Sequence, residues 1–225
     1  MKFPDQAIKQ LRFLLTEGYE LKQALHLIGN HYQLSVKHRK CLERGVCSVL
    51  KAKIRQRKKK GLLRLCGSKI GIDGHNVLIT VESALKGGPL ILADDGFIRD
   101  IAAVSSSYRP SSLTDKALVL ILNVLTLYHP TSLNWYFDAP LAFSGNLAAM
   151  VRERLKEYGL TGDAQAVPVP EHYLIHYELI ATSDRALIDK CVEVVDLAGE
   201  VIKFLNIPIS FFNFRERDHI NKNFL

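Results

Sequence analysis

Short apolar runs alternate with longer helical patterns from residue 69 onward, and this alternation constrains the fold more than any other feature of the chain. Strand–helix units of this kind build a mostly parallel sheet with helices packed against it. We expect strands at 69–73, 89–93, 133–138, 178–182 and 192–196. We expect helices at 76–86, 96–104, 114–128, 145–158, 184–190 and 197–206. Ligands of such a sheet gather at the carboxyl ends of its strands.

The N-terminal part of the chain has a different hydrophobic pattern. Residues 5–48 show the periodicity of three short helices, and Ser35 is placed to cap the third. We therefore predict a small all-α domain over 1–50, a basic linker over 51–68 and an α/β domain over 69–225. The basic third helix is compatible with contact with a nucleic-acid backbone and equally with a solvated charged face.

Charge divides the chain in the same place. Residues 1–69 hold 17 Lys and Arg against 4 Asp and Glu, whereas residues 70–225 hold 13 against 19. A basic front and an acidic back suggest that one part holds phosphates and the other a cation. The densest basic run is a candidate nucleic-acid-binding segment, with a solvated linker helix as the alternative; its residues are Lys51, Lys53, Arg55, Arg57, Lys58, Lys59 and Lys60.

Several classes of protein are disfavoured. No apolar run approaches the length of a membrane span and the start lacks a secretory signal, so we expect a cytoplasmic protein without a membrane partner. The four cysteines and eight histidines do not follow zinc-ligand spacing, and no P-loop or dinucleotide-binding loop is present.

Acids recur where the predicted strands end. Asp73, Asp94, Asp138 and Asp184 each follow a strand-like run. In a parallel sheet these carboxylates would emerge on one edge, where their mutual repulsion is ordinarily relieved by a divalent metal ion. Oxygen ligands favour Mg²⁺ or Mn²⁺. Such an ion can activate water and neutralise the charge that develops on a phosphodiester, which is nuclease chemistry.

Within this hypothesis Asp73 is the central metal ligand, Asp138 and Asp184 complete the metal shell, and Asn76 orients a ligand or the phosphate. Simpler roles exist for single acids. Asp184 and Asp115 each precede a helical pattern and could be N-caps, and Asp94-Asp95-Gly96 could form a turn.

Two motifs resemble a known family. Ile72-Asp73-Gly74-His75-Asn76-Val77-Leu78 resembles the opening motif of PIN-like domains, especially the NYN branch of that nuclease superfamily. Ala181-Thr182-Ser183-Asp184-Arg185 resembles the late Thr-Ser-Asp motif of the same superfamily. The whole chain is similar to uncharacterised, largely archaeal proteins that join a short helical domain to a PIN-like domain.

The resemblance implies an α/β/α sandwich with a central parallel sheet and a metal-dependent endonuclease centre that acts on RNA. It assigns Asp73 and Asp184 as catalytic acids and Asn76 as the motif asparagine. Further candidate acids are Glu82, Asp95, Asp115 and Glu171, and of these only Glu171 stands where an acid is expected before the late motif. The alternative is a catalytically silent PIN-like module that binds RNA or a protein. A phosphate-accepting receiver domain built on Asp94-Asp95 and Asp138 is a third, weaker hypothesis.

Overall fold

A six-stranded parallel sheet forms the centre of the molecule in the computed structural model, which describes residues 4–101, 109–206 and 211–215. The strand order is β1-β8-β7-β2-β5-β6 and every neighbouring pair is parallel. The strands are β1 (Lys59–Lys60), β2 (Lys69–Asp73), β5 (Ser132–Asp138), β6 (Gly162–Val167), β7 (Leu179–Ala181) and β8 (Glu193–Val195).

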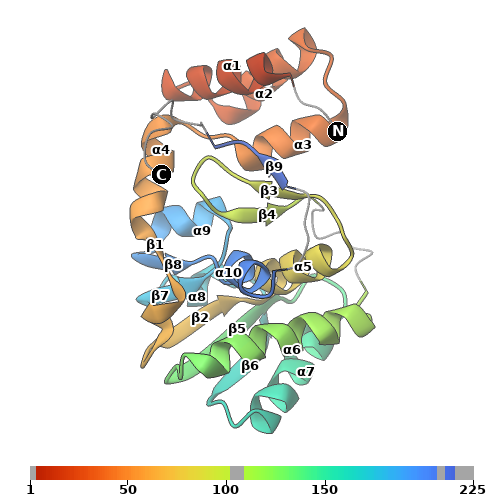
Figure 1. The fold of residues 1–225 in the computed structure, drawn as a ribbon, viewed down its shortest axis with the longest axis vertical. Coiled ribbons are helices and arrows are strands. Elements are labelled where there is room, and N and C mark those ends of the chain that lie inside the picture. The colour runs from red at the N-terminus through yellow and green to blue at the C-terminus, as the bar shows by residue number, and fades with distance from the viewer. Residues whose placement is uncertain (1–3, 102–108, 207–210, 216–225) are drawn as a thin grey trace, which may run out of the picture.

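Helices cover both faces of this sheet, as Figure 1 shows. On one face α5 (Gly74–Leu85), α6 (Ser112–Leu127), α7 (Ser144–Glu157) and α10 (Leu197–Phe204) enclose the largest core, which is built around Ile72, Trp135 and Phe137. On the other face α8 (Glu171–Leu174) and α9 (Arg185–Lys190) pack on Ile180 and Val194. Apolar side chains on alternate residues of β5 point to the large core, as the two-residue period of a strand requires.

The front of the chain forms four helices, α1 (Asp5–Thr16), α2 (Leu21–His31), α3 (Val36–Gly45) and α4 (Val49–Lys58). The Ser35 hydroxyl accepts from the backbone N–H of His38 and caps α3, as predicted. We call α1–α4 the helical region. Its last helix, α4, runs down one side of the molecule and leads through β1 and the short 3₁₀ helix η1 (Leu62–Leu65) into β2 (Figure 1).

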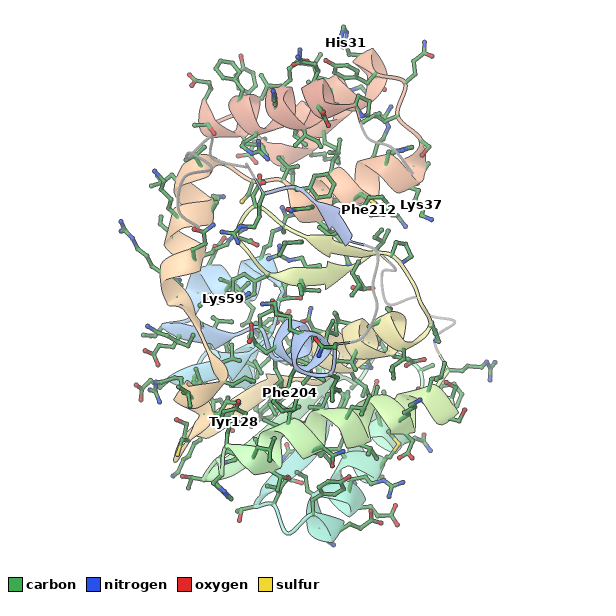
Figure 2. The ribbon with its side chains drawn as sticks, viewed as in Figure 1. His31, Lys37, Lys59, Tyr128, Phe204 and Phe212 are labelled. Carbon is green, nitrogen blue, oxygen red and sulfur yellow. The ribbon has the colours of Figure 1, made fainter. Side chains whose placement is uncertain are left out.

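A second, three-stranded sheet lies between the helical region and the main sheet (Figure 1). Its strands are β3 (Leu90–Leu92), β4 (Ile98–Asp100) and β9 (Phe211–Asn213), in the order β4-β3-β9. Ile91, Ala93 and Phe214 share a core with the helical region, and Phe212, labelled in Figure 2, packs against that core. Leu90 and Ile98 share a core with α5 and α10. The small sheet therefore joins the two parts of the chain.

The predicted fold class is confirmed: a mostly parallel α/β architecture follows an all-helical region. The strands expected at 69–73, 133–138, 178–182 and 192–196 are β2, β5, β7 and β8. Five of the six predicted helices match α5, α6, α7, α9 and α10. Among the described residues there is no helix with the length and apolar character needed to span a membrane.

One predicted element is wrong. Over the described part of the helix expected at 96–104 the chain forms the strand β4, because residues 94–96 turn it back on β3 as a hairpin, with Gly96 at φ +79°. Residues 102–104 of that expected helix lie outside the described residues. The strand expected at 89–93 exists as β3, but it belongs to the small sheet rather than the main one. The edge strand β6 was missed, because only two of its residues, Ala164 and Val167, face the core.

Candidate active site

The order of the main sheet reverses at β2. From β2 the chain continues to β5 and β6 on one side, and then returns to β7 and β8 on the other. A crevice forms at the carboxyl ends of the strands where such a reversal occurs, and ligands bind there. Asp73 is the last residue of β2 and therefore stands at this crevice.

The Asp73 motif turns directly from strand to helix. The Asp73 carboxylate caps α5, accepting from the backbone N–H of Asn76 at 3.4 Å. Gly74 is required by packing, since a Cβ atom there would lie 2.5 Å from the ring of Phe137. The other oxygen of Asp73 accepts a 2.8 Å hydrogen bond from the hydroxyl of Thr182 on the far side of the crevice.

Asn76 joins the same two motifs. Its Oδ1 accepts from the backbone N–H of Ser183 at 2.7 Å and from the Ser183 hydroxyl at 3.1 Å. Because a backbone N–H can only donate, the atom that faces it must be the amide oxygen. Asn76 lines the cavity beside Asp73, and its amide NH₂ is not used by these two hydrogen bonds.

The remaining strand-end acids stand on either side of Asp73. Asp184 begins α9 and its Oδ1 accepts from the backbone N–H of Leu187 at 2.9 Å, so the predicted N-cap is also present. Asp138 ends β5, and its Oδ2 and backbone nitrogen both lie 3.1 Å from Nδ1 of His75. Nε2 of His75 is buried and has no hydrogen-bond partner among the described residues.

These side chains line one cavity of about 170 Å³, which we call the acidic cavity. Asp73, Asp138, Glu171 and Asp184 supply four carboxylates to its wall, and Asp100 from β4 supplies a fifth. The structure thus brings together residues from the ends of three strands of the main sheet, as predicted from the sequence, and adds one from the small sheet.

Electrostatics distinguish this cavity from the rest of the protein. The pKa of Asp73 is raised to about 7, chiefly by burial and also by the negative charges of Asp184 and Asp138, against the lowering effect of the hydrogen bonds from Thr182 and from the Asn76 backbone. No Lys or Arg forms an ion pair with Asp73, Asp138, Glu171 or Asp184 in the described part of the chain.

Buried acids elsewhere in the described residues all have a cationic partner. The pairs are Glu82 with Lys86, Asp94 with Arg12, Asp95 with Arg99 and Arg55, Asp100 with Arg44, and Asp196 with Lys59. Asp73, Asp138 and Glu171 are half-buried and Asp184 is exposed, and these four gather around one cavity without a Lys or Arg ion pair in the described residues. Uncompensated carboxylates around one cavity are the donor set that a hard divalent cation satisfies.

The residues present fit such an ion by their chemistry. They are oxygen donors, as Mg²⁺ and Mn²⁺ prefer, and the Arg44 guanidinium on the cavity wall is paired with Asp100 rather than with any of these four carboxylates. In the present arrangement of side chains, no three His, Cys, Asp or Glu residues in the described ranges converge closely enough to hold a metal ion. Mg²⁺ is commonly held by only one or two carboxylates, with waters completing its shell.

Three further candidate acids lie elsewhere. Glu82 is buried on α5 beside Lys86 and Thr114. Asp115 pairs with Arg154 across α6 and α7, and Ser111 rather than Asp115 caps α6. Asp95 lies with Asp94 in the β3–β4 turn, where it is held by two arginines. Neither Asp94 nor Asp95 lines the acidic cavity, so a receiver-like grouping with Asp138 has no geometric support.

Much of the basic run is engaged within the protein. Arg55 is buried and pairs with Asp95 and Asp189, while Lys58 donates to the last carbonyls of α9. Lys59, labelled in Figure 2, donates to Asp196, and Lys60 pairs with Glu193. The exposed members are Lys51, Lys53 and Arg57. Part of the positive charge of residues 1–69 is therefore used in ion pairs and hydrogen bonds that hold α4 and β1 against the α/β part.

Four residues of the site were not proposed from the sequence as site residues. His75 and Thr182 lie inside the two motifs, so their position in the motif was the available signal. Arg44 and Asp100 pair with each other at 2.7 Å on the cavity wall. Nothing in the local sequence indicates that pairing, because it depends on how the helical region docks.

Comparisons with known proteins agree with the division into two parts. Residues 62–200 match a family model described as "Domain of unknown function (DUF5616)", and residues 5–60 match one described as "Protein of unknown function (DUF434)". The chain is 35% identical over 203 residues to an uncharacterised protein of Methanocaldococcus jannaschii, covering 89% of this chain and 97% of that protein. No solved structure matches.

Proposed function

Because this chain belongs to the family described as "Domain of unknown function (DUF5616)", its activity must be argued from its site, and we propose that this site is a metal-dependent endonuclease centre for RNA. The observation that carries the proposal is the contrast in charge pairing. The carboxylates of Asp73, Asp138, Glu171 and Asp184 line one cavity without a Lys or Arg partner in the described ranges, whereas the fifth carboxylate on that wall, Asp100, is paired with Arg44.

A Mg²⁺ or Mn²⁺ ion held by Asp73, Asp138 and Asp184 would lower the pKa of a bound water and neutralise charge on the scissile phosphodiester. Glu171 lies on the same wall and is the candidate for an additional ligand or for contact with that water. The resemblance of the two motifs to those of PIN-like nucleases supports the same reaction class. It also supports RNA as the substrate.

The protein's own groups hold these carboxylates in place. Thr182 donates to Asp73, and the N-cap bond to Leu187 uses one oxygen of Asp184 while leaving the other free to face a cation. Asn76, fixed by Ser183, presents its amide NH₂ as a donor to a phosphate oxygen. Preorganised donors of this kind stabilise charge in a transition state without reorganising at the moment of reaction.

A second candidate function is a catalytically silent module that binds RNA or a protein. The separation of the carboxylates favours it, because no three ligands converge in the described structure. This hypothesis predicts RNA binding that is unaffected by Mn²⁺ and by substitutions in the acidic cavity.

Cleavage assays separate the two hypotheses. Purified protein would be incubated with 5′-labelled single-stranded RNA and Mn²⁺, with EDTA as the negative control. We expect Asp73→Asn to reduce cleavage at least 100-fold. Glu153→Gln, an exposed acid on α7 without an ion pair, should leave cleavage unchanged and serves as the matched control. Absence of Mn²⁺-dependent cleavage by the wild-type protein would contradict the nuclease proposal.

A further inference from the structure

Two more cavities continue from the acidic cavity along the junction between the helical region and the α/β part. The first, about 300 Å³, shares Arg44, Asn76, Asp100 and Asp184 with the acidic cavity. The second, about 530 Å³, shares Asp184 and Arg185 with the first. We call these the middle and outer cavities. Because neighbouring cavities share wall residues, the three lie side by side, and we refer to them together as the groove.

One wall of this groove comes from the helical region and the other from the turn that carries Asp184. In the middle cavity α3 contributes Lys40 and Arg44, one helical turn apart. In the outer cavity the wall is formed by the α1–α2 connection, including Tyr19, and by the start of α4, including Lys51.

Arg185 stands where the middle and outer cavities meet. It has no carboxylate partner among the described residues, and its guanidinium makes one long hydrogen bond, 3.4 Å to the carbonyl of Val46. Burial and the positive charges of Arg99 and Arg55 lower its pKa. Those two neighbours are matched by the two carboxylates of Asp95 and Asp189, so Arg185 is left as a cation without a paired anion in the described residues.

Tyr19 adds a surface for a base. Its side chain is 55% exposed, lines the outer cavity beside Leu15 and Leu21, and stacks on no aromatic ring in the described structure. An exposed aromatic ring beside cations is the arrangement that binds an unpaired base and its phosphate, because any base offers a π-face for stacking.

The groove walls are fixed in place before any ligand binds. Arg12 makes a buried two-pronged ion pair with Asp94, with bonds of 2.9 and 2.7 Å. Arg44 bonds both the carbonyl and the carboxylate of Asp100 at 2.7 Å. A backbone hydrogen bond from Asp94 to the carbonyl of Gly45 closes the junction further. Ligand binding would therefore not have to pay for ordering the two parts.

We infer that the helical region and the Thr182–Arg185 turn form the two walls of a groove that seats single-stranded RNA, with a phosphate on Arg185 and a base against Tyr19. Lys40 and Lys51 flank this position along the groove. The inference rests on the proposed function in one respect: the RNA strand is taken to run along the groove toward the acidic cavity, where it would be cleaved. It gives the helical region a role in substrate binding.

Exposed acids on the same walls allow a test in which removing a negative charge and removing a positive charge should change RNA affinity in opposite directions. Glu43 lines the middle cavity and Glu20 the outer one, and neither forms an ion pair in the described structure. They oppose a bound phosphate, so neutralising Glu43 should strengthen RNA binding while neutralising Arg185 should weaken it.

Binding is measured in EDTA, so that it is independent of cleavage, by fluorescence anisotropy with a labelled single-stranded RNA of mixed sequence. We expect Arg185→Gln to weaken binding about tenfold and to reduce the salt dependence by about one counterion. Tyr19→Ala should weaken binding about fivefold or more. Glu43→Gln should strengthen it about twofold, and duplex RNA should bind more weakly than the single strand.

Two control variants lie outside the groove. Lys9→Gln removes an exposed cation from α1, and Phe13→Ala removes an exposed ring from the same helix; neither residue lines a cavity of the groove. Both should bind RNA like the wild type. If Arg185→Gln fails to fold, Lys40→Gln with Lys51→Gln, both exposed, tests the same claim.

The inference would be overturned if Arg185→Gln and Tyr19→Ala bound RNA with wild-type affinity. It would also be overturned if Lys9→Gln weakened RNA binding as much as Arg185→Gln does, because the RNA would then contact α1 outside the groove. Failure of the wild type to bind single-stranded RNA would also overturn it. If the wild-type protein binds RNA through the groove but does not cleave it, the nuclease proposal is contradicted and the binding inference stands.

Discussion

The hydroxyl of Thr182 donates a 2.8 Å hydrogen bond to the carboxylate of Asp73, across 109 residues of sequence. This bond links the carboxyl ends of β2 and β7, which are neighbours in the sheet. It holds the central carboxylate of the site and lowers the pKa of Asp73. The two sequence motifs are therefore parts of one structure.

Thr182→Val tests this relationship directly. The substitution preserves shape but removes the hydroxyl donor to Asp73, which then keeps only the 3.4 Å bond from the Asn76 N–H, so we expect a loss of about 1–2 kcal/mol in the free energy of unfolding and roughly tenfold slower RNA cleavage. Denaturant unfolding and the Mn²⁺ cleavage assay would measure these changes. Thr126→Val, which removes a hydroxyl bonded to the Leu122 carbonyl on α6, is the control and should leave cleavage unchanged.

Titration of Asp73 should appear in the stability of the metal-free protein. Its carboxyl has a pKa of about 7 when folded and an ordinary value of 3.8. Between these values the folded state retains a proton that the unfolded state has lost, so the free energy of unfolding falls as pH rises through this window.

Asp73→Asn removes this pH dependence. In EDTA the variant should gain stability relative to the wild type between pH 5 and pH 8, by on the order of 1–4 kcal/mol. Denaturant unfolding at the two pH values measures the difference, with Glu153→Gln as the control. A difference that is the same at both pH values, or of opposite sign, would rule out the raised pKa.

Mn²⁺ should stabilise the protein, and its binding should compete with protonation of the Asp73 carboxyl. A hundredfold excess of Mn²⁺ over its dissociation constant adds about 2.7 kcal/mol to the free energy of unfolding. We expect the increase in melting temperature to be larger at pH 8 than at pH 6, and to be reduced in Asp138→Asn and Asp184→Asn. An increase that survives in Asp73→Asn would place the ion elsewhere.

The junction between the helical region and the α/β part should unfold with the rest of the molecule. Arg12→Ala leaves Asp94 buried without a cation, which typically costs about 3–5 kcal/mol. Lys203→Ala, which breaks the exposed pair with Glu200, should cost less than about 1 kcal/mol.

Circular dichroism and tryptophan fluorescence should report one coincident transition for the wild type, since Trp135 lies in the large core. Two separate transitions would show that the helical region folds independently.

The main sheet and most of its helices were predictable because their residues carry their own periodicity. Buried runs such as Ile70–Asp73 and Trp135–Asp138 show local strand patterns, and the position of parallel strand ends at one edge follows from topology. The convergence of Asp73, Asp138 and Asp184 on one cavity was predicted in this way.

The small sheet was not predictable, because tertiary contacts decide it. Phe97-Ile98-Arg99-Asp100 could form a helix locally, but Arg99 is held by the Asp95 carboxylate and the Ser183 carbonyl, and Ile98 donates its N–H to Asp196. The same contacts draw Asp94 and Asp95 away from the site. Likewise, the positions of Arg185 and Tyr19 in a shared groove depend on how the helical region docks, which no local pattern encodes.

A crystal structure of the wild-type protein soaked in Mn²⁺ tests the central claim most directly. Anomalous scattering at the manganese edge locates the ion without reference to activity. We predict a peak in the acidic cavity, with carboxylate oxygens of Asp73 and of Asp184 or Asp138 at about 2.0–2.3 Å. A peak bound elsewhere, or none at millimolar Mn²⁺ and pH 8, would contradict the assignment of this cavity as a metal-dependent nuclease centre.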